Sequence, residues 1–185
     1  DYITKELKGV IGEQYAAPQG RILMNPFKDV KAAAWYGSYV IDLYNDGVVA
    51  GTSATTYAPN DTLTWAAALK LLLVSHGDLK SEDATGADWS KNTIAKAAEL
   101  GLVAADLDGA KDISRLEFCQ VAAKLNKLAE SKTESKFTDC TDGYVMALVD
   151  AKVIYGMTAT TFEPDASLTR AQIAKIIYQL NLIEK

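Results

Sequence analysis

Two arginines at matching places in the sequence, Arg115 and Arg170, carry its clearest chemical signal. Each directly follows a Ser or Thr that precedes an apolar-periodic run, so each is expected in the first turn of a helix. A cation there opposes the helix macrodipole by a few tenths of a kcal/mol to about 1 kcal/mol. A guanidinium beside the free N–H groups of a helix start can bind an anion. The alternative is a solvent-facing arginine that is tolerated near a cap.

The helix starts that place these arginines follow from capping chemistry. Ser and Thr hydroxyls accept hydrogen bonds from the free N–H groups of the first turn. Glu or Gln three residues later completes a reciprocal capping box. The second and third starts have a full box and the first has half of one, the pairs being Thr64 with Ala67, Ser114 with Glu117, and Thr169 with Gln172.

The capped starts belong to an internal repeat. Residues 156–172 recur at 51–67 without a gap, and a degraded copy ends at 113–117. The predicted repeats are named units 1, 2 and 3 and cover residues 27–77, 78–130 and 131–185. Residues 1–26 form an N-terminal lead-in or linker, with Ile3, Leu7 and Val10 at the spacing of a short helix.

Each unit is predicted to be a helix–loop–helix. Expected helices cover about 33–46 and 65–75 in unit 1, the face of Ile94 and Ala97 and then 115–129 in unit 2, and the face of Val145 and Leu148 and then 170–180 in unit 3. Units of about 50 residues cannot bury a core alone, so they must pack on one another. A solenoid and a closed ring both achieve this. The sequence therefore predicts an all-α fold in one compact domain, with a pseudo-threefold arrangement around a central three-helix bundle.

Bulk properties narrow the function. The formal charge of −5 argues against a nucleic-acid partner. Membrane insertion is not expected, because no apolar run approaches the roughly 18 residues that span a bilayer. Asp1 opens a mixed polar stretch without the features of a signal peptide, so the sequence is expected to begin inside a longer protein or at a processed end.

The chain holds two cysteines, Cys119 and Cys140, and a single histidine, His76. Neither cysteine has metal-ligand spacing and one histidine cannot complete a zinc set, so no metal ion and no cofactor are expected. Both cysteines align with apolar positions of the repeat, which predicts that they are buried. Whether they form a disulfide stays open. The common catalytic motifs are absent from the sequence, so no catalytic residues and no enzyme activity are predicted.

The combined pattern resembles three tandem S-layer homology repeats over about residues 27–183. The motifs that carry the resemblance are Phe27-x-Asp29, Trp35, Gly47–Gly51, Tyr57-x-Pro59, Phe162-x-Pro164 and the stretch from Leu168 to Gln172. The resemblance implies a non-catalytic module on the bacterial cell surface, tethered to other domains of a parent protein. Its implied partner is an acidic amino-sugar polymer, a secondary cell-wall polysaccharide that often bears a pyruvate ketal. The anionic group would meet Arg115 and Arg170 in grooves between repeats.

Other residues of the motifs have both structural and ligand-binding interpretations. Glycine is expected at positions 51 and 156 either because the backbone conformation there requires Gly51 and Gly156, or because it allows close approach of the glycan. Each unit has an aspartate near its start that is either a turn cap or a glycan contact, these being Asp29, Asp83 and Asp139.

The tryptophans also enter these predictions. Trp65 replaces the motif arginine in unit 1, where its indole would stack on a sugar face. Trp35 and Trp89 are expected to pack in the core. Each unit lacks one part of the motif: unit 1 lacks the arginine, unit 2 lacks the Tyr-x-Pro loop, and unit 3 lacks the helix tryptophan. One or two of the three grooves are therefore expected to bind the glycan. The alternative function is a helical-repeat module that binds a protein partner or has a structural role.

Overall fold

The computed structural model describes residues 13–16 and 22–183, and the helices within them carry the fold. In chain order these are α2 (Gly37–Asn45), α3 (Trp65–His76), α4 (Trp89–Glu99), α5 (Arg115–Leu125), α6 (Gly143–Asp150) and α7 (Arg170–Leu180). The prediction of an all-α fold is confirmed for this part of the chain, apart from one small hairpin. The short helix predicted around Ile3, Leu7 and Val10 lies outside the described residues.

The hairpin pairs β1 (Glu13–Ala16) with β2 (Ile22–Asn25) in antiparallel fashion. Sequence reasoning missed it, because Pro18, Gly20 and Pro26 led to the interpretation of this stretch as a linker. The hairpin is fixed to α2 by the Asn45 amide, which accepts a hydrogen bond from the Met24 N–H (3.0 Å) and donates one to the Met24 carbonyl (2.8 Å). The second strand is thus part of the packing around unit 1.

Side-chain caps decide where the second helix of each unit begins. The side chains of Thr64, Ser114 and Thr169 accept hydrogen bonds from the N–H groups three residues on. The reciprocal bond from the cap N–H to Glu117 or Gln172 completes a capping box at α5 and α7. Helices α3, α5 and α7 accordingly start at the predicted residues.

Two other helix boundaries differ from the prediction. Helix α2 starts at Gly37 rather than near residue 33, and its N-cap Tyr36 makes no side-chain cap bond. Helix α5 ends at Leu125 rather than near residue 129, because the Asn126 side chain bonds the Ala122 carbonyl and Lys127 takes a left-handed φ of 56°.

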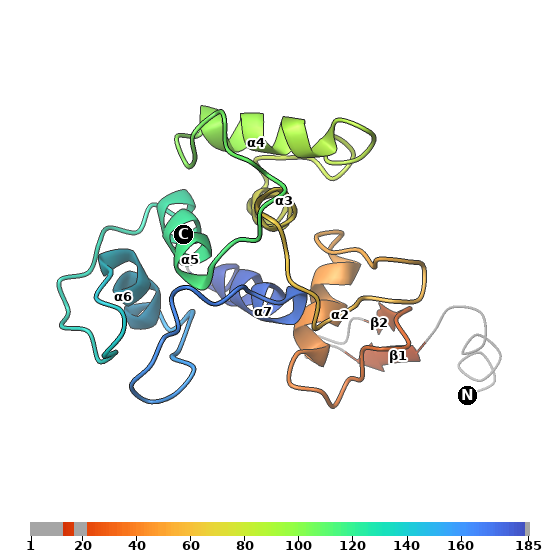
Figure 1. Ribbon diagram of the computed structural model, residues 1–185. Helices are drawn as coiled ribbons and strands as arrows, with labels where there is room; N and C mark the ends of the chain where they lie inside the picture. The colour runs from red at the N-terminus through yellow and green to blue at the C-terminus, as the bar shows by residue number, and fades with distance from the viewer. Residues whose placement is uncertain (1–12, 17–21, 184–185) are drawn as a thin grey trace.

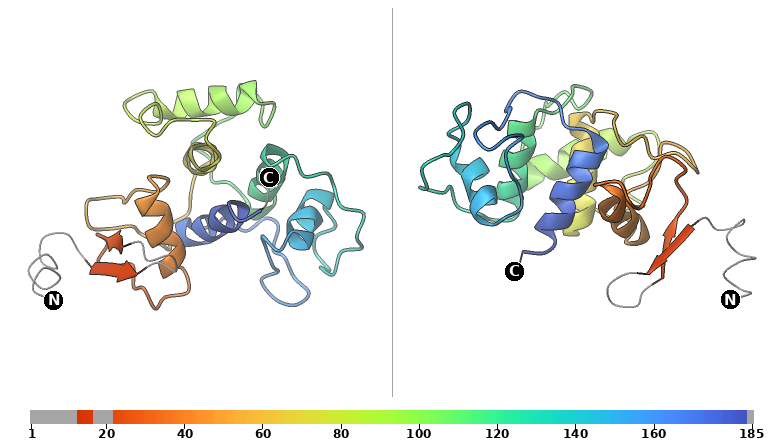
Figure 2. Two further views of the ribbon diagram at one scale, coloured as in Figure 1. Left: turned by 180° about the vertical axis from the view of Figure 1, so that it is seen from behind. Right: turned by 90° about the horizontal axis from the view of Figure 1, so that it is seen from below.

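The helices pack in pairs that cross unit boundaries (Figure 1). Helix α4 of unit 2 packs on α3 of unit 1, α6 of unit 3 packs on α5 of unit 2, and α2 of unit 1 packs on α7 of unit 3. The last pair joins the start of the folded chain to its end, so the contacts form a closed cycle rather than an open solenoid. Helices α3, α5 and α7 lie toward the middle in Figures 1 and 2. The stricter pseudo-threefold arrangement stays a prediction.

Backbone hydrogen bonds repeat this cycle. The first N–H groups of α3 donate to the carbonyls of Lys111 (2.8 Å) and Gly109 (3.0 Å) in unit 2. Those of α5 donate to residues 166 and 164 in unit 3, and those of α7 donate to residues 61 and 59 in unit 1. Donors that a helix start leaves unpaired are therefore satisfied by the loop of the next unit.

The apolar core fills the space between these helices. The largest fully buried side chains come from all three units and include Tyr57, Leu69, Leu72, Phe118, Phe162, Ile173 and Ile177. Burying one such apolar side chain contributes about 1.5–3 kcal/mol to the stability of the fold. Cys119 and Cys140 are buried as predicted, and they are free thiols. No helix within the described residues has the length and apolar character needed to cross a bilayer.

Candidate functional site

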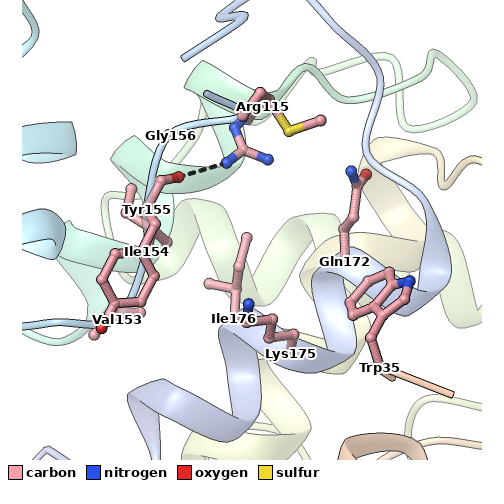
Figure 3. Close-up of a pocket in the computed structure, with 10 residues that line it drawn as sticks. Trp35, Arg115, Val153, Ile154, Tyr155, Gly156, Gln172, Lys175 and Ile176 are labelled. Atoms are coloured by element: carbon pink, nitrogen blue, oxygen red, sulfur yellow. Dashed lines mark hydrogen bonds between the residues drawn. The ribbon is translucent and has the colours of Figure 1, made fainter. Parts of the chain in front are cut away.

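A pocket of about 180 Å³ lies where all three units meet (Figure 3). Trp35 comes from unit 1 and Arg115 from unit 2, whereas the remaining lining belongs to unit 3, namely Val153, Ile154, Tyr155, Gly156, Met157, Gln172, Lys175 and Ile176. Arg115 enters from the start of α5, and Gln172, Lys175 and Ile176 project from α7. The pocket therefore exists only when the chain has closed its cycle of contacts.

Arg115 is the buried cation of this pocket, with 7% of its surface exposed. Its Nη2 donates to the Tyr155 carbonyl oxygen at 2.9 Å, and its Cζ lies 4.8 Å from the centre of the Phe162 ring. Within the described part of the chain, its Nε–H has no hydrogen-bond partner. Figure 3 shows the guanidinium pointing into the pocket. The alternative interpretation of a solvent-facing arginine is thus wrong for this residue.

The electrostatics of Arg115 are those of a buried charge that lacks a close counter-ion. Burial lowers the pKa of its guanidinium, while Cys119 and Glu163 act in the opposite direction. No ion pair that the structure places among its described residues includes Arg115. Arginine nevertheless keeps its proton in proteins, and a buried charge is costly unless it is paired. The pocket can therefore accept an anion, and Lys175 adds a second cation to its wall.

Arg170, the equivalent of Arg115 in unit 3, is held differently. Its Nε donates to the Tyr57 carbonyl and its Nη2 to the Ala50 carbonyl, both at 2.7 Å. Its Cζ lies 4.5 Å from the centre of the Tyr57 ring. Burial raises the pKa of Tyr57 to about 12 despite the opposing charge of Arg170. Arg170 thus ties unit 3 to the loop of unit 1.

Asp29 and Asp139 hold the two complete loops. The carboxylate of Asp29 accepts hydrogen bonds from the N–H groups of Tyr57 (2.9 Å) and Ala58 (2.8 Å). Asp139 accepts the equivalent bonds from Phe162 (2.8 Å) and Glu163 (2.9 Å), which lower its pKa. These bonds support the interpretation of Asp29 and Asp139 as caps of the loops.

The capped loops have a strained shape. Ala58 and Glu163 adopt left-handed φ values of 58° and 61°, a region that residues other than glycine rarely occupy. Asp83 in unit 2 instead lies exposed in a turn, where its N–H bonds the Lys80 carbonyl. Unit 2 has the shorter loop, so Asp83 is not matched to a Tyr-x-Pro segment.

Gly51 and Gly156 occupy equivalent crowded turns. A Cβ at Gly51 would collide with the carbonyl oxygens of Ser53 and Thr56, and one at Gly156 with those of Thr158 and Thr161. Crowding by these backbone carbonyl oxygens is therefore sufficient to require glycine at both positions. Gly156 also lines the pocket.

Two sequence-based predictions about the site need correction. The N–H groups at the starts of α5 and α7 are not free for an anion, because the loop carbonyls of the next unit accept the first ones and the cap side chains accept the third. Trp65 is only 9% exposed and belongs to the core, so its indole has little surface for a sugar.

Trp35 is the residue that sequence reasoning placed wrongly. It was expected in the core, but it is 57% exposed and stands at the edge of the pocket. It lies in the turn before α2, and its ring and that of Tyr36 are in edge contact at a centroid distance of 5.3 Å. Trp89 is half-buried, with Lys70 Nζ at 5.3 Å from its ring centre. The signal that was available for Trp35 was its position outside the apolar face of the helix predicted over 33–46.

Comparisons with known proteins point to one family. The model of the S-layer homology domain matches residues 26–69 and 138–174. The chain is 30% identical over 179 residues to an endoglucanase of Bacillus sp. (strain KSM-635), which is 84% of the chain and 18% of that protein. It is 37% identical over 84 residues to the surface-layer 125 kDa protein of Lysinibacillus sphaericus, covering 42% of the chain and 7% of that protein.

A third relative is an enzyme of a different name. An amylopullulanase of Thermoanaerobacterium thermosulfurigenes is 28% identical over 192 residues, covering 93% of the chain and 10% of that protein. The chain thus spans 18% or less of the length of each of these three relatives. What the relatives share with it is a small part of much longer proteins.

Proposed function

From the premise that this chain belongs to the S-layer homology family, we propose that it anchors a larger bacterial surface protein to the cell wall. It does so without catalysis, by binding an anionic cell-wall polysaccharide from outside the cell. Membership rests on the family match to residues 26–69 and 138–174 together with a relative that is 30% identical over 84% of the chain. That unit 2 is a third repeat belongs to the proposal, and the matching neighbour contacts of α4 and α5 support it.

The observation that carries the proposal is the buried, unpaired guanidinium of Arg115 in an open pocket. A carboxylate such as that of a pyruvate ketal on an amino sugar would supply the missing counter-charge. The charge-assisted hydrogen bonds formed in this way contribute about 1.5–3 kcal/mol each. Lys175 would add attraction from the opposite wall of the pocket.

Aromatic side chains suit the sugar ring of such a ligand. Trp35 and Tyr155 are 57% and 55% exposed and both line the pocket. Flat, rigid aromatic surfaces contribute strongly to binding at a small entropic cost. An amino sugar with its anionic group at Arg115 can therefore place an apolar face against either ring.

The proposal is tested by sedimentation with purified bacterial cell-wall sacculi before and after removal of their non-peptidoglycan polymers. We expect the chain to sediment with intact sacculi and to remain in solution after stripping. Sedimentation that is unchanged by stripping contradicts the proposal. Capture of a protein partner that is insensitive to both salt and stripping would favour the protein-interaction alternative.

Arg115→Gln tests the same proposal at its central residue. We expect sedimentation with intact sacculi to weaken at least tenfold, because losing one charge-assisted bond costs about 1.5–3 kcal/mol and 1.4 kcal/mol is a factor of ten. Lys132→Gln removes an equal charge from an exposed loop and serves as the matched control. Equal binding by the two variants would disprove the role of Arg115.

A further inference from the structure

The two motif arginines occupy equivalent sequence positions but unequal surroundings. Arg115 donates a hydrogen bond from Nη2 to the Tyr155 carbonyl of its neighbouring loop, and its Nε–H is left without an acceptor in the described part of the chain. Arg170 makes the equivalent Nη2 bond to Ala50 and, in addition, a 2.7 Å bond from Nε to the Tyr57 carbonyl. Arg115 is therefore held to its neighbouring loop by one fewer side-chain hydrogen bond than Arg170, and its buried Nε–H lacks an acceptor.

The aromatic side chains at matching repeat positions also have different surroundings. Trp35 borders the Arg115 pocket beside Lys175, and more than half of its surface is exposed. The residues that match Trp35 and Lys175 in the repeat are Trp89 and Lys70, and Lys70 Nζ lies over the Trp89 ring at 5.3 Å from its centre. The Lys70 ammonium thus already covers the face of the Trp89 ring on which a sugar would stack.

We infer that the motif arginines have divided roles, so that Arg115 receives the anionic group of the ligand whereas Arg170 clamps unit 3 to unit 1. This inference rests on the proposed function for the role of Arg115. The equivalent position in unit 1 holds the buried Trp65 and brings no charge. The chain therefore takes one acidic sugar residue through the Arg115 pocket, and the other two positions serve to close the fold.

The clamp has a physical basis in the way the chain closes. Arg170 begins the last helix, and both loop carbonyls it binds belong to unit 1, more than a hundred positions earlier. The two backbone bonds from the start of α7 to residues 61 and 59 lie beside it. Replacing Arg170 would leave the Tyr57 and Ala50 carbonyls without these donors, which weakens the joint between the first and last units.

Calorimetric titration with a synthetic methyl glycoside of a pyruvylated N-acetylhexosamine tests the division of roles. We expect one ligand per chain for the wild type and at least tenfold weaker binding for Arg115→Gln. Arg170→Gln should lower the melting temperature yet, well below it, keep the affinity within about threefold. Arg170→Lys provides a milder variant should the glutamine variant not fold. Two ligands per chain, or equal loss of affinity in folded variants of both arginines, would overturn the inference.

Side-chain NMR separates this inference from the proposed function. The arginines of the chain are Arg21, Arg115 and Arg170, so their Nε–H signals are readily assigned by substitution. In the ligand-free chain we expect the Arg170 signal to exchange slowly because of its bond to Tyr57, and the Arg115 signal to shift most on titration. If the wild type binds neither glycoside nor sacculi, the proposed function fails. A fast-exchanging Arg170 Nε–H would reject the clamp whether or not the ligand binds.

Discussion

At Arg115 the chain keeps a guanidinium that is removed from water and bonded to a single carbonyl, in a pocket that Trp35 borders. The interior of a protein usually pairs such a charge, because an unpaired one is costly. Here the burial strengthens any interaction with an entering anion. The residue that destabilises the free chain is therefore the one that has most to gain from a ligand.

Trp35→Ala is the sharpest residue-scale prediction outside the charged groups. Because the side chain is 57% exposed, we expect its removal to change the free energy of unfolding little while weakening binding to intact sacculi about tenfold or more. The measurement is sedimentation together with thermal unfolding. Leu182→Ala removes a similarly exposed apolar side chain at the chain end and should leave binding unchanged. A variant at Trp35 that binds like the Leu182 control would contradict the site.

At the scale of elements, capping chemistry determines both the helix starts and the direction of the arginines. The caps fix α5 and α7 at Arg115 and Arg170, so that each guanidinium projects toward the loop of the next unit. The third N–H of each helix is bonded to its cap, and the first two to that loop. Capping and inter-unit contact are thus parts of one joint.

Ser114→Ala removes the cap of α5. We expect a loss of about 1 kcal/mol in the free energy of unfolding, because the Glu117 N–H loses its acceptor and the box is broken. Urea unfolding measures this, and Ser81→Ala at an exposed turn position is the control. A change no larger than that of the control would show that the joint does not depend on the box.

The same element-scale chemistry explains what the sequence could and could not predict. Helix starts at 65, 115 and 170 were predictable because Ser and Thr caps act locally. The hairpin was not, because Asn45 of a distant helix anchors it. Nor was the pocket, because no local signal shows that Trp35 of unit 1 meets Arg115 of unit 2 beside α7 of unit 3. The motif arginines were found by type and position, and their different hydrogen bonds depend on tertiary contacts.

At the scale of the whole molecule, each unit completes the next. The first helices pack on the second helices of other units, and the starts of α3, α5 and α7 donate to a neighbouring loop. The site inherits this dependence, since its lining is drawn from all three units. We therefore expect the proposed binding to need the closed chain rather than a single repeat.

This closure predicts one cooperative unfolding transition. Independent units would unfold in steps, as nearest-neighbour repeat arrays can, whereas a closed cycle loses contacts on both sides of any unit that opens. We expect urea transitions followed by far-UV circular dichroism and by tryptophan fluorescence to coincide. Because Trp35, Trp65 and Trp89 lie in units 1 and 2, a separate opening of unit 3 would appear as two non-coincident curves and would contradict the prediction.

The most direct test of the central claim is a crystal of this chain soaked with a pyruvylated amino-sugar fragment. We expect the fragment to fill the pocket between the three units, with its carboxylate at the Arg115 guanidinium and its ring beside Trp35. A fragment bound at Arg170 or Trp65 instead, with the Arg115 pocket empty, would contradict it.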